Sequence, residues 1–123
     1  MYRLLRQKRG GYFIDLAAND AVDLSNSLGL ERNADWNGLC IEPNPLYWKN
    51  LTYRRCQTVG AVVGARRDEH VHFRFRAAEY GGIVGHGFDN GPRWQRESVI
   101  QSTVTLYEIF QRYQVPRDID YLS

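Results

Sequence analysis

The feature that most constrains the fold is a pair of short apolar segments, each ending in a carboxylate. The first, residues 11–16 (Gly-Tyr-Phe-Ile-Asp-Leu), is followed by small residues and then by a segment with helix signals. The second, residues 38–42 (Gly-Leu-Cys-Ile-Glu), repeats the pattern one helix-length further along the chain. Segments of this kind are typical of buried parallel strands. The pair therefore predicts an α/β fold in which strands and helices alternate.

Turn and helix signals separate the expected strands. Asp20 is a suitable N-cap for a helix between the first two strands. After the second strand, Asn44 is another good N-cap and Pro45 fits the first helical position. This helix is expected to run to about Arg55, and an apolar strand at residues 57–63 follows it. Three strands alternating with two helices predict parallel pairing and right-handed crossovers.

The second half of the chain departs from this alternation. Apolar residues occupy every second position of residues 71–76, which predicts a half-exposed strand. The glycine-rich residues 79–102 are expected to be irregular. Residues 105–108 (Thr-Leu-Tyr-Glu) fit a capping box that opens a helix to about Tyr113. A fourth strand is expected to begin at Ile119.

Length and charge limit the domain organisation and the partners. A chain of 123 residues is expected to form a single domain, with residues 1–10 as a lead-in. Its net charge of +2 gives no reason to expect a nucleic-acid or membrane partner, and the basic amino end is interpreted as solvated surface. No apolar stretch approaches the length of a membrane span.

The chain has two cysteines, Cys40 and Cys56. Cys40 lies inside an apolar strand, where a thiol behaves as a small hydrophobic residue. Two cysteines placed in this way do not predict a disulfide scaffold, so a reducing compartment is favoured. We therefore expect a cytoplasmic protein.

The acidic strand ends favour one class of nucleoside ligand. Dinucleotide sites need glycines where the backbone approaches the pyrophosphate, and residues 17–21 (Ala-Ala-Asn-Asp-Ala) contain none. Asp15, Asp20 and Asp23 would repel a pyrophosphate by roughly 1 kcal/mol or more per close pair. S-adenosylmethionine carries no phosphate and has a net positive charge. Glu42 lies where ribose hydroxyls are bound in such folds.

A purely structural role stays open for three of these acids. Asp20 and Asp23 can serve as helix caps. Asp15 can be a hydrogen-bonded carboxylate inside the core. Glu42 is the most informative acid, because it ends a strand one βα unit after the first.

Several segments together resemble the FkbM-type S-adenosylmethionine-dependent methyltransferases. The likeness is carried by residues 11–21, 38–45 and 119–123, and it extends to Ser25-Asn26, Ala61-Val62 and Thr105-Leu106. The resemblance implies a Rossmann-like methyltransferase sheet, mostly parallel, and methylation of hydroxyl groups on sugars or small natural products. It also implies a cofactor site formed by Asp15, Ala17, Asn19, Asp20, Glu42 and Asn44.

The chain departs from that family in two respects. Ala17 and Ala21 replace glycines that are usual in the cofactor loop, and each methyl group could crowd the cofactor. The acidic strand end and Glu-Gly turn that follow the Asp-Tyr-Leu-Ser strand of the family are absent after Ser123. The resemblance thus implies an amino-terminal part of the domain, with a sheet incomplete at the carboxyl end.

Two other classes of function stay open. A catalytically silent fragment could act as an interaction module and form a homodimer through an exposed sheet edge. An NAD-dependent Rossmann enzyme is the second alternative. No catalytic base can be assigned and no metal site is expected. The pair His70 and His72 is more typical of a solvated strand, and His86 of an ordinary loop.

Overall fold

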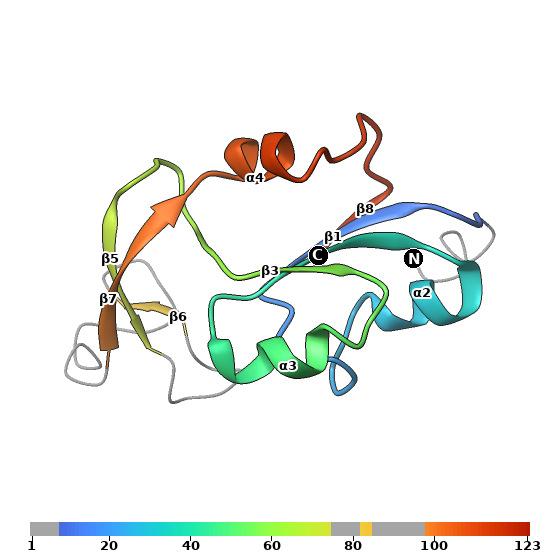
Figure 1. The fold of residues 1–123 in the computed structure, drawn as a ribbon, viewed down its shortest axis with the longest axis horizontal. Coiled ribbons are helices and arrows are strands. Elements are labelled where there is room, and N and C mark those ends of the chain that lie inside the picture. The colour runs from blue at the N-terminus through green and yellow to red at the C-terminus, as the bar shows by residue number, and fades with distance from the viewer. Residues whose placement is uncertain (1–7, 75–81, 85–97) are drawn as a thin grey trace. The chain divides into compact units, whose positions relative to one another are not determined.

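The computed structural model describes residues 8–74, 82–84 and 98–123 of the chain (Figure 1). The single domain expected from the length is divided into two compact units. One unit comprises Met1–Gly60 and Pro116–Ser123, and the other comprises Ala61–Val115. The candidate site residues all belong to the first unit.

The first unit contains a four-stranded sheet in which all neighbouring strands are parallel, which confirms the α/β class. Its strands are β1 (Tyr12–Leu16), β2 (Asn37–Ile41), β3 (Gln57–Val59) and β8 (Tyr121–Leu122). The strand order is β3-β2-β1-β8. From β1 the chain therefore adds strands on one side, and the last strand pairs on the other side. The strand order reverses beside β1.

Short helical segments cover one face of this sheet (Figure 1). They are α2 (Leu28–Ala34), the 3₁₀ turn η1 (Pro45–Tyr47) and α3 (Trp48–Leu51). Buried residues of these helices, of the strands and of the loops between them form a single cluster: Phe13, Ala18, Ala21, Leu30, Ala34, Trp36, Cys40, Leu51 and Cys56. Burial of this apolar surface is the main stabilising contribution to the unit.

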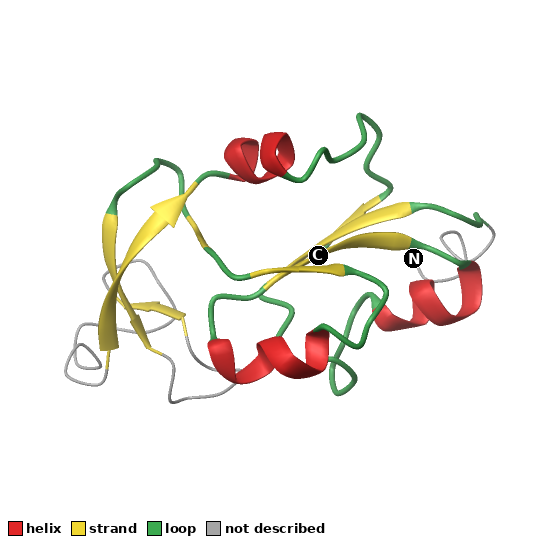
Figure 2. Cartoon of the chain, in the orientation of Figure 1, coloured by secondary structure: helices red, strands yellow, loops and turns green. Residues whose placement is uncertain are grey.

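The first helix begins later than the sequence predicted. Asp20 caps no helix: its Oδ1 atom accepts the N–H groups of Val22 and Asp23 at 2.8 and 2.9 Å and closes a turn. Leu24 lies in the left-handed region (φ 59°) and is 86% exposed, so a helix cannot run through it. Turns and loops therefore precede α2, which begins at Leu28 (Figure 2).

The second helix begins as predicted and ends early. The Asn44 side chain accepts the Leu46 N–H at 3.0 Å, and Pro45 occupies the start of η1. Regular helix ends at Leu51 and not near Arg55. The residues that follow are therefore free to turn back toward the sheet, which places Arg54 beneath α2.

The expected third strand, residues 57–63, is two strands. β3 belongs to the parallel sheet, whereas β4 (Val62–Val63) belongs to the sheet of the other unit. At the break, a Cβ atom on Gly60 would lie 2.5 Å from the Trp48 ring. The ring packs directly on the backbone there, so only glycine fits.

The second unit has a mixed sheet of order β4-β7-β5-β6. Its further strands are β5 (His70–Arg74), β6 (Gly82–Val84) and β7 (Ser98–Val104). β5 confirms the strand predicted from alternation and pairs antiparallel with β6 and β7, whereas β4 pairs parallel with β7. β6 and most of β7 lie within residues 79–102, where no regular element was expected. Residues 85–97 lie outside the described residues.

The helix predicted from the capping box is α4 (Leu106–Arg112). Both capping bonds are present: Thr105 Oγ1 accepts the Glu108 N–H, and the Glu108 carboxylate accepts the Thr105 N–H, each at 3.1 Å. No helix in the described part of the chain has the length and apolar character needed to cross a membrane.

Candidate ligand-binding site at the strand ends

The loop after β1 crosses to the end of β2. Ala18 N–H donates to the Ile41 carbonyl at 3.1 Å, and Asn19 N–H donates to Glu42 Oε1 at 2.8 Å. Ala17 and Asn19 have φ angles of 53° and 54°, in the left-handed region that favours glycine. This conformation turns the backbone so that its amide groups face the neighbouring strand end.

Glu42 is buried at the end of β2 and is held by backbone amides. Glu42 is only 2% exposed. Oε1 accepts from Asn19, and Oε2 accepts the Asn44 N–H at 2.8 Å. A carboxylate oxygen can accept more than one hydrogen bond. Glu42 is thus fixed in orientation, and its oxygens keep acceptor capacity beyond these two hydrogen bonds.

Asp15 is buried near the carboxyl end of β1, and a side-chain hydrogen bond holds its carboxylate. It is 3% exposed, and its Oδ2 accepts the Ser27 hydroxyl at 2.5 Å. Asp15 pairs with Cys40 in the β1–β2 register. Because side chains alternate along a strand, Asp15, Cys40 and Glu42 share one face of the sheet.

The two carboxylates influence each other. Burial raises the pKa of Asp15, while the Ser27 hydrogen bond and the Arg54 cation lower it and Glu31 raises it. Burial also raises the pKa of Glu42; the Asn44 and Asn19 amides lower it, and the charge of Asp15 raises it. A cationic ligand at these strand ends would relieve this repulsion.

A buried network, absent from the sequence predictions, lies beneath Asp15. The Arg54 and Glu31 side chains are 4% and 5% exposed and form an ion pair with an N–O distance of 3.0 Å. Arg54 also donates to Ser27 Oγ at 2.9 Å and to Ser25 Oγ at 3.2 Å. One signal was available: residues 27, 30, 31 and 34 have the spacing of a buried helix face, and a charge on such a face needs a partner.

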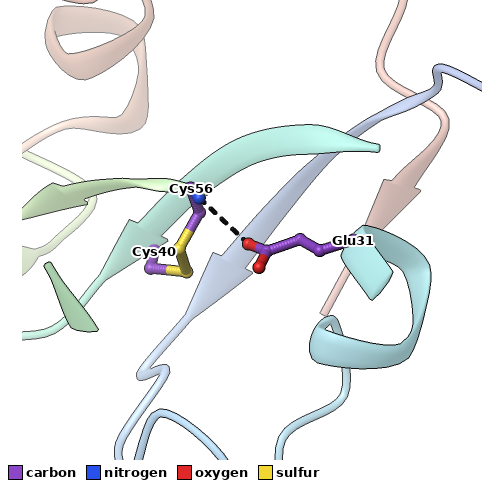
Figure 3. A group of neighbouring side chains, drawn as sticks. All are labelled: Glu31, Cys40 and Cys56. Atoms are coloured by element: carbon purple, nitrogen blue, oxygen red, sulfur yellow. Dashed lines mark hydrogen bonds between the residues drawn. A yellow bond between two sulfur atoms is a disulfide. The ribbon is translucent and has the colours of Figure 1, made fainter. Parts of the chain in front are cut away.

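The two cysteines form a disulfide, contrary to the sequence prediction (Figure 3). Cys40 is fully buried, as expected for its strand, but its sulfur is bonded to that of Cys56 across a Cα–Cα distance of 5.9 Å. The Cys56 N–H donates to Glu31 at 3.0 Å, which joins the disulfide to the buried network (Figure 3). The premise of unpaired cysteines is therefore wrong, and the reducing compartment inferred from it stays a prediction.

The same three residues form a group that resembles a metal site. Ligand atoms of Glu31, Cys40 and Cys56 all lie within 4.8 Å of one another, and all three residues are buried. The sulfurs are bonded to each other, whereas a metal requires thiolates. Glu31 already accepts hydrogen bonds from Arg54 and Cys56. These contacts account for the cluster without an ion.

The structure brings together most of the expected cofactor residues. Asn19, Glu42 and Asn44 are joined by hydrogen bonds, and Ala17 is exposed in the same loop. Asp20 serves the turn described above. The methyl group of Ala21, expected to crowd the cofactor, is packed in the core.

The histidines considered from the sequence lie elsewhere. His70 and His72 are on β5 in the second unit. His86 lies outside the described residues. Neither observation assigns a catalytic base.

The candidate site lies at the carboxyl ends of β1 and β2. Two buried carboxylates share a sheet face, and one of them is held by loop amides. Comparison with known proteins adds nothing to it: no family model, no curated protein and no solved structure matches this chain.

Proposed function

We propose that this chain binds S-adenosylmethionine and is a methyltransferase of the FkbM type, acting on a hydroxyl group of a sugar or small natural product. One observation carries the proposal. Asp15 and Glu42 lie buried on one sheet face, at the carboxyl ends of neighbouring parallel strands. They lie beside the point where the strand order reverses. Open α/β sheets bind their ligands at such points, which also supports a Rossmann-like topology.

The charge of the site favours a cationic nucleoside. Asp15 raises the pKa of Glu42, so the two carboxyl groups repel each other when both are ionised. A positive ligand lowers that repulsion, whereas a pyrophosphate adds to it. This distinction favours S-adenosylmethionine over NAD, the second alternative from the sequence.

The proposed roles follow from which groups hold each carboxylate. Glu42 accepts hydrogen bonds from the ribose hydroxyls, and the amides of Asn19 and Asn44 keep it in place. Asp15 faces the amino-acid end of the cofactor. The cofactor supplies an activated methyl group, and the chain binds, orients and shields it from water. No described residue is assigned as the base that takes the hydroxyl proton.

The disulfide is an observation that bears on the compartment. The sequence predicted the cytoplasm, but disulfides persist mainly in oxidising compartments. We infer that the Cys40–Cys56 bond favours an oxidising compartment. Alkylation of the protein in intact cells, followed by mass spectrometry, tests this: two alkylated cysteines would restore the cytoplasmic prediction.

Titration calorimetry tests the cofactor. The full chain should bind S-adenosylmethionine and S-adenosylhomocysteine more tightly than NAD. Glu42→Gln should weaken both S-adenosylhomocysteine and adenosine by about tenfold or more, because a hydrogen bond to a charged group is lost. Asp35→Asn is the matched control, since this acid pairs only with the exposed Arg9 and Arg55 in the described structure.

Two results would overturn the proposal. Binding of NAD without S-adenosylhomocysteine would favour the dehydrogenase alternative. No binding of any nucleoside at millimolar concentration would favour the silent interaction module. In the described sheet, β3 and β8 each pair on one side only, so the module would form a homodimer through an edge. Analytical ultracentrifugation would detect that dimer.

A further inference from the structure

We propose that Arg54 is a positioning residue: acting through Ser27, it fixes the Asp15 carboxylate for the amino-acid end of the cofactor. This inference rests on the proposed function and extends it to a side chain that touches no ligand. Its basis is a continuous chain of buried hydrogen bonds from Arg54 to the end of β1.

The Arg54 guanidinium is held on several sides. Nε donates to Glu31 at 3.2 Å, Nη1 donates to Ser25 Oγ at 3.2 Å, and Nη2 donates to Ser27 Oγ at 2.9 Å. The guanidinium also lies 6.0 Å from the ring centroid of Phe13. A planar group with contacts in three directions has little freedom to move.

The hydroxyl of Ser27 passes this constraint to Asp15. A serine hydroxyl has one hydrogen to donate. Because the oxygen of Ser27 accepts from Arg54, its hydrogen points to Asp15 Oδ2, 2.5 Å away. Ser27 is fully buried, so water cannot compete for either bond. The Asp15 oxygen that bonds to Ser27 is thus fixed in place.

Arg54 also acts on Asp15 through its charge. Arg54 is the cation that faces it, and the acids that face it are Glu31 on α2 and Glu42 on the neighbouring strand. Arg54 and the Ser27 hydrogen bond both lower the pKa of Asp15 against the effect of burial. Loss of Arg54 should therefore move the protonation of Asp15 to higher pH.

Three variants separate positioning from folding. Arg54→Lys keeps the charge and loses the planar fork that contacts Ser25, Ser27 and Glu31 together. The double variant Glu31→Gln/Arg54→Met removes both charges of the ion pair, so Glu31 is not left as an unpaired buried charge, and it keeps an oxygen for the Cys56 N–H. Arg55→Met is the matched control, because Arg55 pairs with the exposed Asp35.

The ligands distinguish the two strand ends. S-adenosylhomocysteine carries the amino-acid group, whereas adenosine carries only the parts assigned to Glu42. The double variant should weaken S-adenosylhomocysteine by about tenfold and leave adenosine unchanged. Arg54→Lys should show a smaller loss with the same selectivity, and Arg55→Met should show none.

Equal weakening of both ligands, or no weakening in a folded double variant, would overturn the inference. NMR titration of the ¹³C-labelled Asp15 carboxyl group tests it without a ligand. A midpoint that rises in Arg54→Lys, which keeps the charge but no longer fixes the Ser27 hydroxyl, supports the inference, and an unchanged midpoint overturns it. If the wild type binds neither nucleoside, the proposed function fails, and this titration still decides the role of Arg54.

Discussion

The ends of β1 and β2 present two buried carboxylates that are held in different ways. Asp15 is held by side chains, through Ser27 and Arg54. Glu42 is held by the backbone amides of Asn19 and Asn44. Substitution of Ser27 or Arg54 can remove the contacts that hold Asp15. The contacts that hold Glu42 come from backbone amides and depend on the conformation of two loops. Neighbouring strand ends can therefore differ in how sensitive their carboxylates are to substitutions elsewhere in the chain.

The β1 end also depends on a buried ion pair and its hydrogen bonds, whereas Glu42 has no described hydrogen bond to that network. Arg54 and Glu31 join the segment after α3 to α2, and the disulfide joins β2 to the residue before β3. Substitutions in this network should therefore lower stability and ligand binding together. Substitutions at the β2 end should act mainly on Glu42 itself.

The largest effect is expected from Arg54→Met. It leaves Glu31 charged and unpaired in the interior, which should lower the free energy of unfolding by about 3–5 kcal/mol. Arg55→Met, in the adjacent position, should leave it nearly unchanged because that ion pair is exposed. Urea denaturation of both variants measures the difference. Similar unfolding midpoints for the two would show that burial of the network contributes little.

Removal of the disulfide should have the next largest effect. The bond closes a loop with a sequence separation of 16 residues. Loop closure of this size predicts a loss of about 3 kcal/mol in Cys40→Ala/Cys56→Ala. Thermal melting of the variant and of the wild type, with and without reductant, measures it. If reductant does not change the melting temperature of the wild type, the stabilising role of the Cys40–Cys56 disulfide is contradicted.

Glu42→Gln tests the backbone-held half. An amide group has one oxygen, so its NH₂ must face the N–H of Asn19 or Asn44 and one hydrogen bond is lost. We expect the free energy of unfolding to fall by about 1–3 kcal/mol. Urea denaturation measures it, with Glu69→Gln in the other unit as an exposed control. A loss as large as that of Arg54→Met would remove the proposed contrast between the strand ends.

Stability should depend on pH in opposite directions at different groups. The pKa values of Asp15 and Glu42 are raised above their ordinary values of 3.8 and 4.5. Between the ordinary and the raised pKa, the folded state holds a proton that the unfolded state has released. The free energy of unfolding therefore falls as pH rises through this window, by at most about 1.4 kcal/mol per pH unit for each group. Asp35 and Asp120 have lowered pKa values and lose their contribution as pH falls below 3.8.

A variant at the β1 end sharpens this contrast. Ser27→Ala removes a donor that lowers the pKa of Asp15, so the pH window in which stability declines should extend upward. No comparable side-chain deletion exists for Glu42, whose donors are backbone amides. Urea unfolding midpoints of Ser27→Ala and of the wild type, measured between pH 4 and 8, give this window. A window that does not move in Ser27→Ala would mean that burial alone sets the pKa of Asp15.

The elements that the sequence predicted are those with local signals. Tyr12–Leu16 was found as a buried strand because its residues are apolar on both faces, and α4 was found because Thr105 and Glu108 form a capping box within one turn. Asn44 and Glu42 were placed correctly for the same reason. Turn chemistry and strand-end position are properties of a few neighbouring residues.

The spacing of α2 indicates a buried charge at Glu31, but no local signal identifies its partner or the disulfide. Arg54 and Glu31 are 23 residues apart, and their pairing depends on how α2 and the chain after α3 meet on the sheet. Cys40 and Cys56 are brought together only when β2 and β3 pair. The break at Gly60 depends on the Trp48 ring that packs against it. Contacts set by tertiary structure could not be read from spacing.

The smallest expected effect concerns the loop that joins the two strand ends. Ala17 has a φ of 53° and is exposed, so its methyl group makes no contact that offsets the left-handed conformation. That conformation costs an L-residue about 1–2 kcal/mol, whereas glycine adds about 0.4–1 kcal/mol of unfolded-state entropy. Ala17→Gly should therefore stabilise the chain by about 0.5 kcal/mol, measured by urea denaturation. Ala21→Gly is the matched control and should destabilise it, because that methyl group is buried in the core. If Ala17→Gly also destabilised the chain, the loop would owe its shape to Ala17 itself and not to the amide contacts that hold Glu42.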